Sequence, residues 1–290
     1  MMLSSVPPKQ GREPTERTAP SEDRHTGHSM PSQPRTYRRW SFPTGMLLDA
    51  KGSRTISVVI PARNEESTVA DVVAAVAEPH LGRNGGTGLV DEILVVNDGS
   101  SDATGSAAAA AGAKVITRAS STGKASAMTE GVEAASGDLV VFLDADVLNT
   151  RPDYVPSLVG PLLADDDVAL VKGFYERPLH DAPTGGGRVT ELVARPLIDL
   201  YFPELAAIRQ PLAGETAAPR SVLLELDFAS GYGVEIGLLI DVATRFGVES
   251  IAQVDLGVRV HRNRPISELR PMAAEVMAAA MARVSESSKR

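Results

Sequence analysis

The chain has 290 residues, 43% of them hydrophobic, and a formal net charge of −8 at pH 7. This length suits one large α/β domain with ample material for a core, and the negative charge argues against a nucleic-acid-binding protein. The absence of cysteine excludes disulfides and thiolate metal sites, and without a signal-peptide segment or a membrane-spanning apolar run we expect a cytoplasmic protein.

The N-terminal part differs in composition from the rest. Residues 1–40 are rich in Pro, Ser, Thr, Arg and Glu, which predicts a mostly disordered arm. Tyr37, Trp40 and Phe42 form an aromatic cluster that is expected to dock this arm onto the domain. The domain itself is predicted at 41–285, with a nucleotide-binding half at 54–150, an acceptor half at 151–285 and a tail at 286–290.

From residue 55 the chain alternates between strand and helix patterns. β-Branched residues predict a strand at 55–60 that ends at Pro61. Asn64 is expected to cap the next helix. The apolar face of that helix repeats at helical spacing, at Val69, Val72, Val73 and Val76. Further strands are predicted at 92–96, 114–117 and 140–143, with helices near 102–112 and 125–135. This order predicts a Rossmann-like α/β fold with a mostly parallel central sheet flanked by helices.

Polar residues follow three of these strands where each one ends. They are Asn64 and Glu65, then Asp98, then Asp144 and Asp146 with Ala145 between them. The carboxyl ends of parallel strands meet at one edge of a sheet, where open α/β folds bind ligands. Carboxylates there suit a hard divalent cation such as Mg²⁺ or Mn²⁺, and Asp146 is the candidate ligand. The alternative is a solvated acidic turn in which Asp144 caps the next helix.

The second half carries two clusters of basic residues. A glycine run at 185–187 opens a helix beside Arg188 and Thr190, which predicts an anion site; a flexible linker with a capping Thr is the alternative. A strand at 251–260 runs into Arg259, His261, Asn263 and Arg264. His261 is a candidate second metal ligand, although this segment could also be a solvated basic rim.

A metal beside two anion sites indicates group transfer. The metal would neutralise a departing diphosphate, with Lys124 and the arginines adding positive charge. Arg188, Thr190 and Asn263 would hold a small anionic acceptor. The last predicted helix, at 267–284, carries a methionine stripe that we expect to serve packing or a dimer contact.

Three segments of the first half resemble the nucleotide-sugar half of GT-A fold glycosyltransferases. They are VIPARNEE at 59–66, VNDGSSDAT at 96–104 and Asp-Ala-Asp at 144–146. Three later segments, at 185–196, 231–241 and 251–264, resemble the glucosyl-3-phosphoglycerate synthases of actinobacteria. The similarity covers about residues 54–285. It implies a retaining transfer of glucose from UDP-glucose to the 2-hydroxyl of 3-phosphoglycerate, the first step towards glucosylglycerate and methylglucose lipopolysaccharides.

The resemblance also implies roles for individual residues. The nucleotide and diphosphate would be bound by Pro61, Ala62, Arg63, Asn64, Glu65, Asp98, Lys124, Asp144 and Ala145. The metal would be bound by Asp146 and His261. Phosphoglycerate would be bound by Gly187, Arg188, Val189, Thr190 and Asn263, and the sugar by Tyr232, Gly233, Val234 and Glu235. Arg259 and Arg264 are further substrate-binding candidates. At Arg63 and Asp98 the sequence departs from the family's Leu and Ser.

The catalytic step is expected to proceed at the front face, with the donor phosphate assisting deprotonation of the acceptor. No protein nucleophile is then needed. Glu235 is the candidate catalytic carboxylate, orienting acceptor or sugar hydroxyls; its alternative role is charge complementarity at a helix start. Alternative functions are a mannosyl-3-phosphoglycerate synthase that uses GDP-mannose, a nucleotidyltransferase, and a sugar-nucleotide-binding module without catalysis. The family implies a homodimer.

Overall fold

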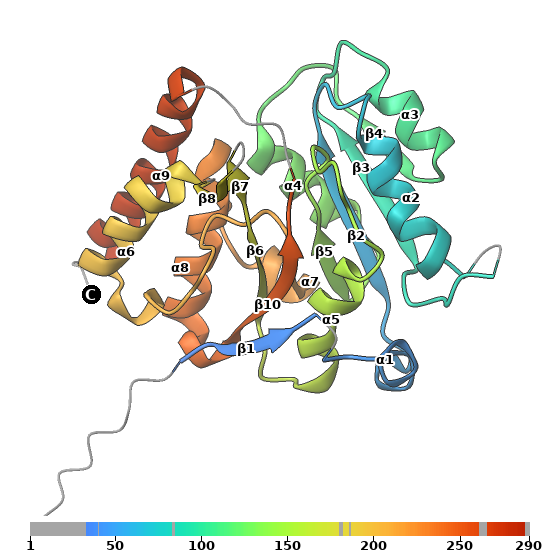
Figure 1. Cartoon of the computed structure of the whole chain (residues 1–290), viewed down its shortest axis with the longest axis horizontal. Coiled ribbons are helices and arrows are strands. Elements are labelled where there is room, and N and C mark those ends of the chain that lie inside the picture. Colours follow the sequence, from blue (N-terminus) through green and yellow to red (C-terminus); the bar gives the residue numbers. More distant parts are fainter. Residues whose placement is uncertain are drawn as a thin grey trace, which may run out of the picture. The chain divides into compact units, whose positions relative to one another are not determined.

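The computed structural model describes residues 33–39, 41–82, 85–179, 182–185, 187–260 and 266–287. Strands in these ranges are β1 (Arg35–Arg38), β2 (Ile56–Ala62), β3 (Glu92–Asn97), β4 (Lys114–Thr117), β5 (Leu139–Phe142), β6 (Leu170–Glu176), β7 (Pro178–Leu179), β8 (Ala182–Gly185), β9 (Thr216–Pro219) and β10 (Ile251–Val258). All except the β7–β8 pair join one sheet in the order β1-β10-β6-β9-β5-β2-β3-β4 (Figure 1). Only β9 runs antiparallel to its neighbours, so the predicted mostly parallel sheet is confirmed.

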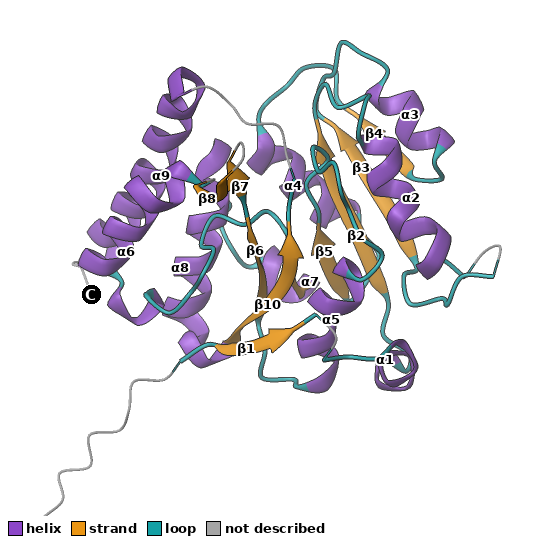
Figure 2. Ribbon diagram, viewed as in Figure 1, coloured by secondary structure: helices purple, strands orange, loops and turns teal. Residues whose placement is uncertain are grey.

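Helices lie on both faces of this sheet (Figure 2). They are α1 (Thr44–Lys51), α2 (Val69–His80), α3 (Thr104–Ala110), α4 (Lys124–Ala134), α5 (Tyr154–Ala164), α6 (Arg195–Tyr201), α7 (Arg220–Leu224), α8 (Val234–Phe246) and α9 (Ile266–Ser287). A π-helical turn at Thr190–Ala194 precedes α6, and single 3₁₀ turns occupy Pro203–Leu205, Gly231–Gly233 and Val248–Ser250. None of the helices in the described part of the chain has the length and apolar character needed to cross a membrane.

The core is divided by the sheet into two clusters because side chains alternate along each strand. Val58 and Ile60 of β2 pack in the cluster that contains α1, α2, α3 and α5, whereas Val59 packs in the cluster of α4, α6, α8 and α9. The four valines of the predicted α2 stripe are at most 1% exposed. Burial of side chains of this size contributes about 1.5–3 kcal/mol each, which fixes α2 against the sheet.

The sheet begins before residue 41, where the sequence analysis placed the end of a disordered arm. β1 pairs in parallel with β10, with Arg35 opposite Ala252, and the Tyr37 ring centroid lies 5.2 Å from that of Phe42. The strand was missed because its side chains are polar. Backbone hydrogen bonds at a sheet edge need no apolar sequence, so polar residues can extend the sheet. Trp40 lies outside the described residues.

Asn64 does not cap α2, which corrects the prediction. The helix starts at Val69, whereas Asn64 has a φ of 56° and its Oδ1 accepts a hydrogen bond of 2.9 Å from the backbone N of Ser101. Asn tolerates this left-handed conformation better than most residues. Asn64 therefore ties together the loops that follow β2 and β3. Strand β2 also continues past Pro61, where the prediction ended it. Pro61 lacks a backbone N–H, but the pairing with β5 ends at Val59, so no hydrogen bond to β5 is lost at Pro61.

Candidate active site

A cavity of about 370 Å³ lies at the sheet edge where β2, β3 and β5 end. The candidate residues that line it are Pro61, Ala62, Arg63, Glu65, Asp98, Lys124, Asp144, Ala145, Asp146, Gly187, Arg188, Val189, Thr190, Tyr232, Glu235 and Arg259. Asn64, Gly233 and Val234 are not in this lining. His261, Asn263 and Arg264 lie outside the described residues. The residues that follow the strands thus surround one space, together with residues from the second half of the chain.

Packing explains why Gly233 and Val234 do not line the cavity. Val234 is fully buried in the core as the first residue of α8. Gly233 lies against α9 so closely that an added Cβ would come within 2.6 Å of the Ala279 Cβ. Both residues therefore serve the packing of α8 and α9 behind the cavity.

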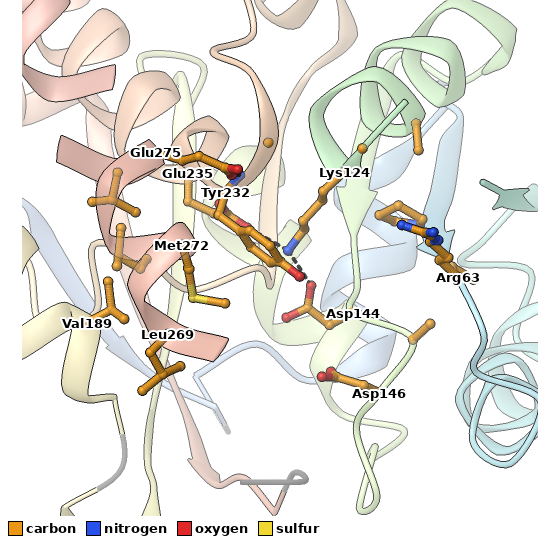
Figure 3. A pocket seen from close by; sticks show the side chains of 18 of the residues that line it. Arg63, Lys124, Asp144, Asp146, Val189, Tyr232, Glu235, Leu269, Met272 and Glu275 are labelled. Atoms are coloured by element: carbon orange, nitrogen blue, oxygen red, sulfur yellow. Dashed lines mark hydrogen bonds and ion pairs between the residues drawn. The ribbon is translucent and has the colours of Figure 1, made fainter. Parts of the chain in front are cut away.

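Lys124 bridges two carboxylates at the centre of the site. As the first residue of α4, it places its Nζ 2.7 Å from Asp144 Oδ1 and 2.6 Å from Glu235 Oε1. Figure 3 shows the ammonium pointing between these two acids. Burial alone would lower the pKa of Lys124, but the charges of Asp144 and Glu235 raise it well above its ordinary value. The lysine is therefore fixed in its charged form.

Arg259 bridges the acidic strand end from the other side. Its NH2 lies 2.9 Å from Asp144 Oδ2 and 3.0 Å from Asp146 Oδ1. Burial alone would raise the pKa of the Asp144 carboxyl, but Lys124 and Arg259 together hold it well below its ordinary value. Asp144 is thus ionised and fully engaged by two cations, which leaves Asp146 as the more available carboxylate.

Behind Arg259 lies a polar layer that the sequence analysis missed. Its NH1 is 3.0 Å from Glu215 Oε2 and 2.6 Å from the Tyr175 hydroxyl. Burial opposes ionisation of the Arg259 guanidinium, but the nearby Glu215, Tyr175 and Asp144 raise its pKa well above the ordinary value. The backbone N of Arg259 donates to the Glu176 carbonyl at 3.0 Å, which extends the β10–β6 pairing and directs the side chain towards the cavity.

Asp146 fits a divalent cation. Its side chain is 30% exposed and lines the cavity, and a carboxylate oxygen is the donor type that Mg²⁺ and Mn²⁺ prefer. Among the described residues there is no group of three or more metal-ligating side chains. A cation at Asp146 would therefore take further ligands from water and substrate phosphate, as Mg²⁺ commonly does. The proposed second ligand, His261, lies outside the described residues.

Asp98 organises the loop in front of Lys124. Its Oδ2 accepts hydrogen bonds from the Ser121 hydroxyl at 2.6 Å and the Gly123 N at 3.1 Å, and its Oδ1 accepts one from the Thr122 N at 3.1 Å. Asp98 as a whole is 4% exposed, so its carboxylate accepts most of its hydrogen bonds from within the protein. Asp98 thereby fixes the start of α4 and, with it, Lys124.

The opposite wall starts at Gly187, whose φ of 78° favours glycine. The chain becomes helical from Arg188, and the Thr190 side chain is buried at the cavity. Free backbone N–H groups occur at such a helix start, and they attract anions. Arg177, two residues after Tyr175, lies next to this turn: a Cβ on Gly187 would be 3.9 Å from its Cδ. This wall is basic, in contrast to the acidic end of β5.

Helix α9 closes the cavity on a third side. Leu269, Met272 and Val276 line the cavity, and Figure 3 shows Met272 and Leu269 on the side opposite Asp146. The backbone N of Tyr232 donates to Glu275 Oε2 at 2.7 Å, which ties the 231–233 turn to this helix. We expected the methionine stripe to serve packing or a dimer contact. Met272 packs against the core, as predicted, and also lines the cavity, whereas Met277 is 49% exposed.

Lys172, Tyr175, Arg177 and Glu215 were absent from the sequence predictions. Arg177 had a usable signal, because it directly follows the apolar strand β6 at the same sheet edge as Asp98 and Asp144. Glu215 had none. It precedes β9, whose short Thr-Ala-Ala-Pro sequence has little strand character, and only its antiparallel direction brings Glu215 to the active edge.

The cavity can accept two anionic molecules at once. On one side Lys124, Arg259 and a cation at Asp146 can take a diphosphate; on the other Arg188, Arg177 and the helix start can take a smaller anion. Among the described residues the only carboxylate that contacts Lys124 besides Asp144 is Glu235. The arrangement therefore supports group transfer between two bound molecules more readily than hydrolysis of one.

Comparisons with known proteins agree with this arrangement. The glycosyl transferase family 2 model matches residues 57–201. The chain is 48% identical over 262 residues to the glucosyl-3-phosphoglycerate synthase of Mycobacterium tuberculosis H37Rv, covering 86% of this chain and 79% of that protein. It is 42% identical over 253 residues to the same enzyme of Petrotoga mobilis, covering 83% and 77%. The crystal structure of the M. tuberculosis enzyme with Mn²⁺, UDP-glucose and phosphoglyceric acid superposes with a TM-score of 0.78 at 46% identity, over 87% of each chain.

Proposed function

The chain belongs to the glucosyl-3-phosphoglycerate synthase family, within glycosyl transferase family 2, and we propose that it transfers glucose from UDP-glucose to the 2-hydroxyl of 3-phosphoglycerate with retention of configuration. One observation carries the proposal: a single cavity joins the cation-bridged Asp144–Asp146 strand end to the basic turn at 187–190. A nucleotide diphosphate fits the first side and a phosphorylated acid fits the second. The product is glucosyl-3-phosphoglycerate.

The donor binds on the side of the parallel strands. Pro61, Ala62, Arg63 and Glu65 contact the nucleotide, and Asn64 holds their loop through its hydrogen bond with Ser101. Asp98 acts through the Ser121–Gly123 loop that it organises. Lys124 and Arg259 stabilise the negative charge that develops on the leaving diphosphate, and Asp144 with Ala145 positions the donor. A preorganised cation costs no reorganisation during the reaction, which is why the fixed Lys124–Asp144 pair suits this role.

A divalent cation, Mg²⁺ or Mn²⁺, completes the donor site, with Asp146 and His261 as its protein ligands. It supplies Lewis-acid stabilisation of the diphosphate. Crystal structures of the M. tuberculosis relative contain these cations together with UDP or UDP-glucose. Asp146 is more available for this role than Asp144, because Arg259 contacts one oxygen of Asp146 whereas Lys124 and Arg259 together engage both oxygens of Asp144.

The acceptor binds on the side of residues 187–190. Arg188, the Thr190 hydroxyl and the backbone N–H groups of the helix start hold 3-phosphoglycerate, with Asn263 and Arg264 as further contacts. Tyr232 lines the cavity under the sugar, and Gly233 and Val234 support it from behind by packing α8 against α9. We assign residues 54–150 to the donor half and residues 151–285 to the acceptor half, although Arg259 crosses from the second half to contact Asp144.

Retention requires no protein nucleophile if the acceptor hydroxyl attacks from the face that the diphosphate leaves. The donor phosphate then takes the acceptor proton. Glu235 orients the acceptor or sugar hydroxyls, and Lys124 keeps this carboxylate in place through the 2.6 Å contact. Glu235→Gln keeps the shape of the side chain and removes its charge. We expect turnover to fall by about 100-fold, and near-normal turnover would remove Glu235 from the mechanism.

The central experiment offers the purified protein 3-phosphoglycerate and Mg²⁺ with either UDP-glucose or GDP-mannose. We expect glucosyl-3-phosphoglycerate and UDP from the first pair. A mannosylated product from the second pair alone would favour the related mannosyl transfer, and release of pyrophosphate would favour nucleotidyl transfer. Absence of a glycosylated product from both donors would contradict the proposal.

The enzyme acts as a homodimer. Leu192, Leu200 and Tyr201, in and just before α6, are 72%, 73% and 45% exposed, and Met277 of the neighbouring α9 is 49% exposed. Large apolar side chains gathered at a surface commonly mark a contact with another chain. Sedimentation should give twice the mass of the chain, and Leu200→Glu should shift the protein towards a monomer.

The enzyme operates in the cytoplasm, where its two substrates are held by their charges. Both the nucleotide sugar and the phosphorylated acid are anionic and do not cross a bilayer unaided. Fractionation of cells that produce the protein at natural levels tests this assignment, and recovery with the membrane pellet at low and high salt would contradict it.

A further inference from the structure

Arg177 is a cation at the cavity for which the proposed function names no contact with the acceptor. It follows β6 directly and lines the cavity. Its NH2 donates to the Tyr175 hydroxyl at 2.6 Å, and its guanidinium lies 4.9 Å from the centroid of the Tyr175 ring. These two contacts involve one face and one nitrogen of the guanidinium. They fix its position without satisfying all five of its donors.

Within the described residues, the hydrogen bond to Tyr175 is the one that the Arg177 side chain makes. Its Nε is buried and makes no hydrogen bond, and Arg177 forms no ion pair within the described residues. An unpaired buried donor on a charged group is costly, since such groups are normally hydrogen-bonded or paired. No described residue supplies an acceptor for this Nε, so the guanidinium can receive an anionic ligand from the cavity.

The neighbours of Arg177 indicate where that partner binds. Its Cδ lies beside Gly187, at the turn that precedes Arg188 and Thr190. The helix start there offers backbone N–H groups in an array that suits the oxygens of a phosphate. The planar fork of a guanidinium matches a planar carboxylate. Under the proposed function the acceptor carries both groups, one on each side of the hydroxyl that reacts.

We propose that Arg177 binds the carboxylate of the acceptor while the 187–190 turn binds its phosphate, so that Arg177 selects a phosphorylated hydroxy acid over a phosphorylated alcohol. This inference rests on the proposed function. With both ends of the acceptor held, the hydroxyl between them can point only towards the donor. Arg177 is thus a specificity-determining residue.

Tyr175 is the positioning residue for this contact. Its hydroxyl accepts hydrogen bonds of 2.6 Å from both Arg177 and Arg259, and its ring is 4.9 Å and 5.1 Å from their guanidinium carbons. Arg259 in turn contacts Asp144 and Asp146 on the donor side. The buried tyrosine therefore sets the spacing between the cation that contacts the acceptor and the cation that contacts the donor.

The experiment compares wild type with Arg177→Met, which keeps a stem to pack on Tyr175 and removes the charge. The KM for 3-phosphoglycerate is measured at saturating UDP-glucose, and the inhibition constant of glycerol 3-phosphate, which lacks the carboxylate, is measured alongside. We expect the KM to rise about 10- to 100-fold, the size of a lost charged hydrogen-bonded pair. The inhibition constant and the KM for UDP-glucose should change less than about twofold.

Two further variants sharpen the comparison. Arg209→Met is the matched control, because its guanidinium also lies over an aromatic ring of β6, 4.5 Å from the Phe174 centroid, but it is exposed and outside the cavity lining. All its constants should stay at wild-type values. Tyr175→Phe keeps the ring and removes the shared acceptor, so it should raise the KM for 3-phosphoglycerate while the packing of the ring is retained.

The outcomes separate this inference from the proposed function. An unchanged KM in active Arg177→Met, or an equal loss of affinity for glycerol 3-phosphate, would overturn the role of Arg177 and leave glucosyl transfer intact. If wild type formed no product, calorimetry would compare 3-phosphoglycerate binding to both proteins. Weaker binding to the variant would then support Arg177 although the proposed function had failed. Equal binding, or no binding to wild type, would overturn both.

Discussion

Arg259 and Glu215 form an ion pair in the interior, with NH1 3.0 Å from Oε2 and side chains that are 3% and 0% exposed. The same guanidinium contacts Asp144 and Asp146 at the cavity. Glu215 therefore affects the site without lining the cavity. It holds NH1 of Arg259, so that NH2 is positioned against Asp144 and Asp146. Burying such a pair costs desolvation, so its presence points to positioning of Arg259 more than to stability.

Glu215→Ala should be strongly destabilising. It leaves the inner end of the Arg259 guanidinium without its acceptor, and breaking a buried pair typically costs about 3–5 kcal/mol. Glu215→Gln retains the shape and one acceptor oxygen, so it should cost roughly 1–3 kcal/mol. Urea unfolding of the three proteins gives the free energies. A cost near zero for Glu215→Gln, beside a large cost for Glu215→Ala, would show that packing, not charge, is what Glu215 contributes.

Gly214→Ala tests how tightly Asp144 is enclosed. A Cβ at residue 214 would come 2.3 Å from Asp144 Oδ1 and 2.4 Å from Oδ2, so the carboxylate must move off Lys124 or Arg259. A displacement near 1 Å at a reacting centre can reduce turnover by about 100-fold. We expect a fall in kcat of roughly 10- to 100-fold, with at most about 3 kcal/mol lost in stability.

The control for this substitution is Gly45→Ala. An added Cβ at residue 45 meets nothing within 4 Å, and this glycine is near the start of α1, far along the chain from the site. Activity should be unaffected. If Gly214→Ala also left kcat at the wild-type value, the position of Asp144 would not limit turnover.

The sequence predicted the helices and strands correctly where the local pattern agrees with the position of the segment in the fold. The apolar repeat of α2 and the continuous apolar run of β5 identify each element, and the parallel order then brings Asp98 and Asp144 to one edge. The failures are local exceptions. Asn64 is a residue type that often caps helices, but here it adopts a left-handed conformation. Strand β1 is polar, yet it extends the edge of the sheet through backbone hydrogen bonds.

Contacts between side chains that are far apart in the sequence could not be predicted from the sequence. Arg259 and Asp144 are 115 positions apart, and nothing in either segment identifies the other as its partner. Their contact depends on the strand order, in which β9 separates β5 from β6. Glu215 reaches Arg259 for the same reason. The sequence predicted which residue types would be at the edge, but their pairing follows from a strand that was not predicted.

Asp146→Asn should remove the dependence of UDP binding on the metal. In wild type we expect Mg²⁺ to strengthen UDP binding by about 10-fold or more, since second-shell and ligand changes at metal sites commonly have this size. The variant loses the charged oxygen donor and should bind UDP equally with Mg²⁺ and with EDTA. Titration calorimetry measures this directly, without turnover.

Asp153→Asn is the control for the metal test. Asp153 pairs with Arg151 at 3.0 Å and Arg39 at 3.6 Å and is not among the cavity-lining residues. Its removal should leave the effect of Mg²⁺ intact. A persistent effect of Mg²⁺ in Asp146→Asn would instead mean that the cation binds at another group.

Lys172 predicts an unusual response of stability to alkaline pH. It is 2% exposed beneath the site, where its Nζ donates to the Ala213 carbonyl at 2.6 Å and the Thr216 hydroxyl at 3.1 Å. Burial lowers its pKa to about 8, with Glu235 opposing the shift and Lys124 adding to it. The unfolded lysine titrates near 10.5. Between these two values the unfolded chain therefore holds more protons at this residue, and stability from this group rises with pH.

The Lys172→Met variant lacks this titration. Subtracting its free energy of unfolding from that of wild type removes the contributions of all other titrating groups. The free energy of unfolding of wild type minus that of the variant should grow from pH 8 towards pH 10.5, with a slope of up to about 1.4 kcal/mol per pH unit. Urea unfolding at closely spaced pH values measures the difference. A difference that stays constant over this window would give Lys172 an ordinary pKa. A falling difference would reverse the sign, and Lys172 would then be held in its charged form like Lys124.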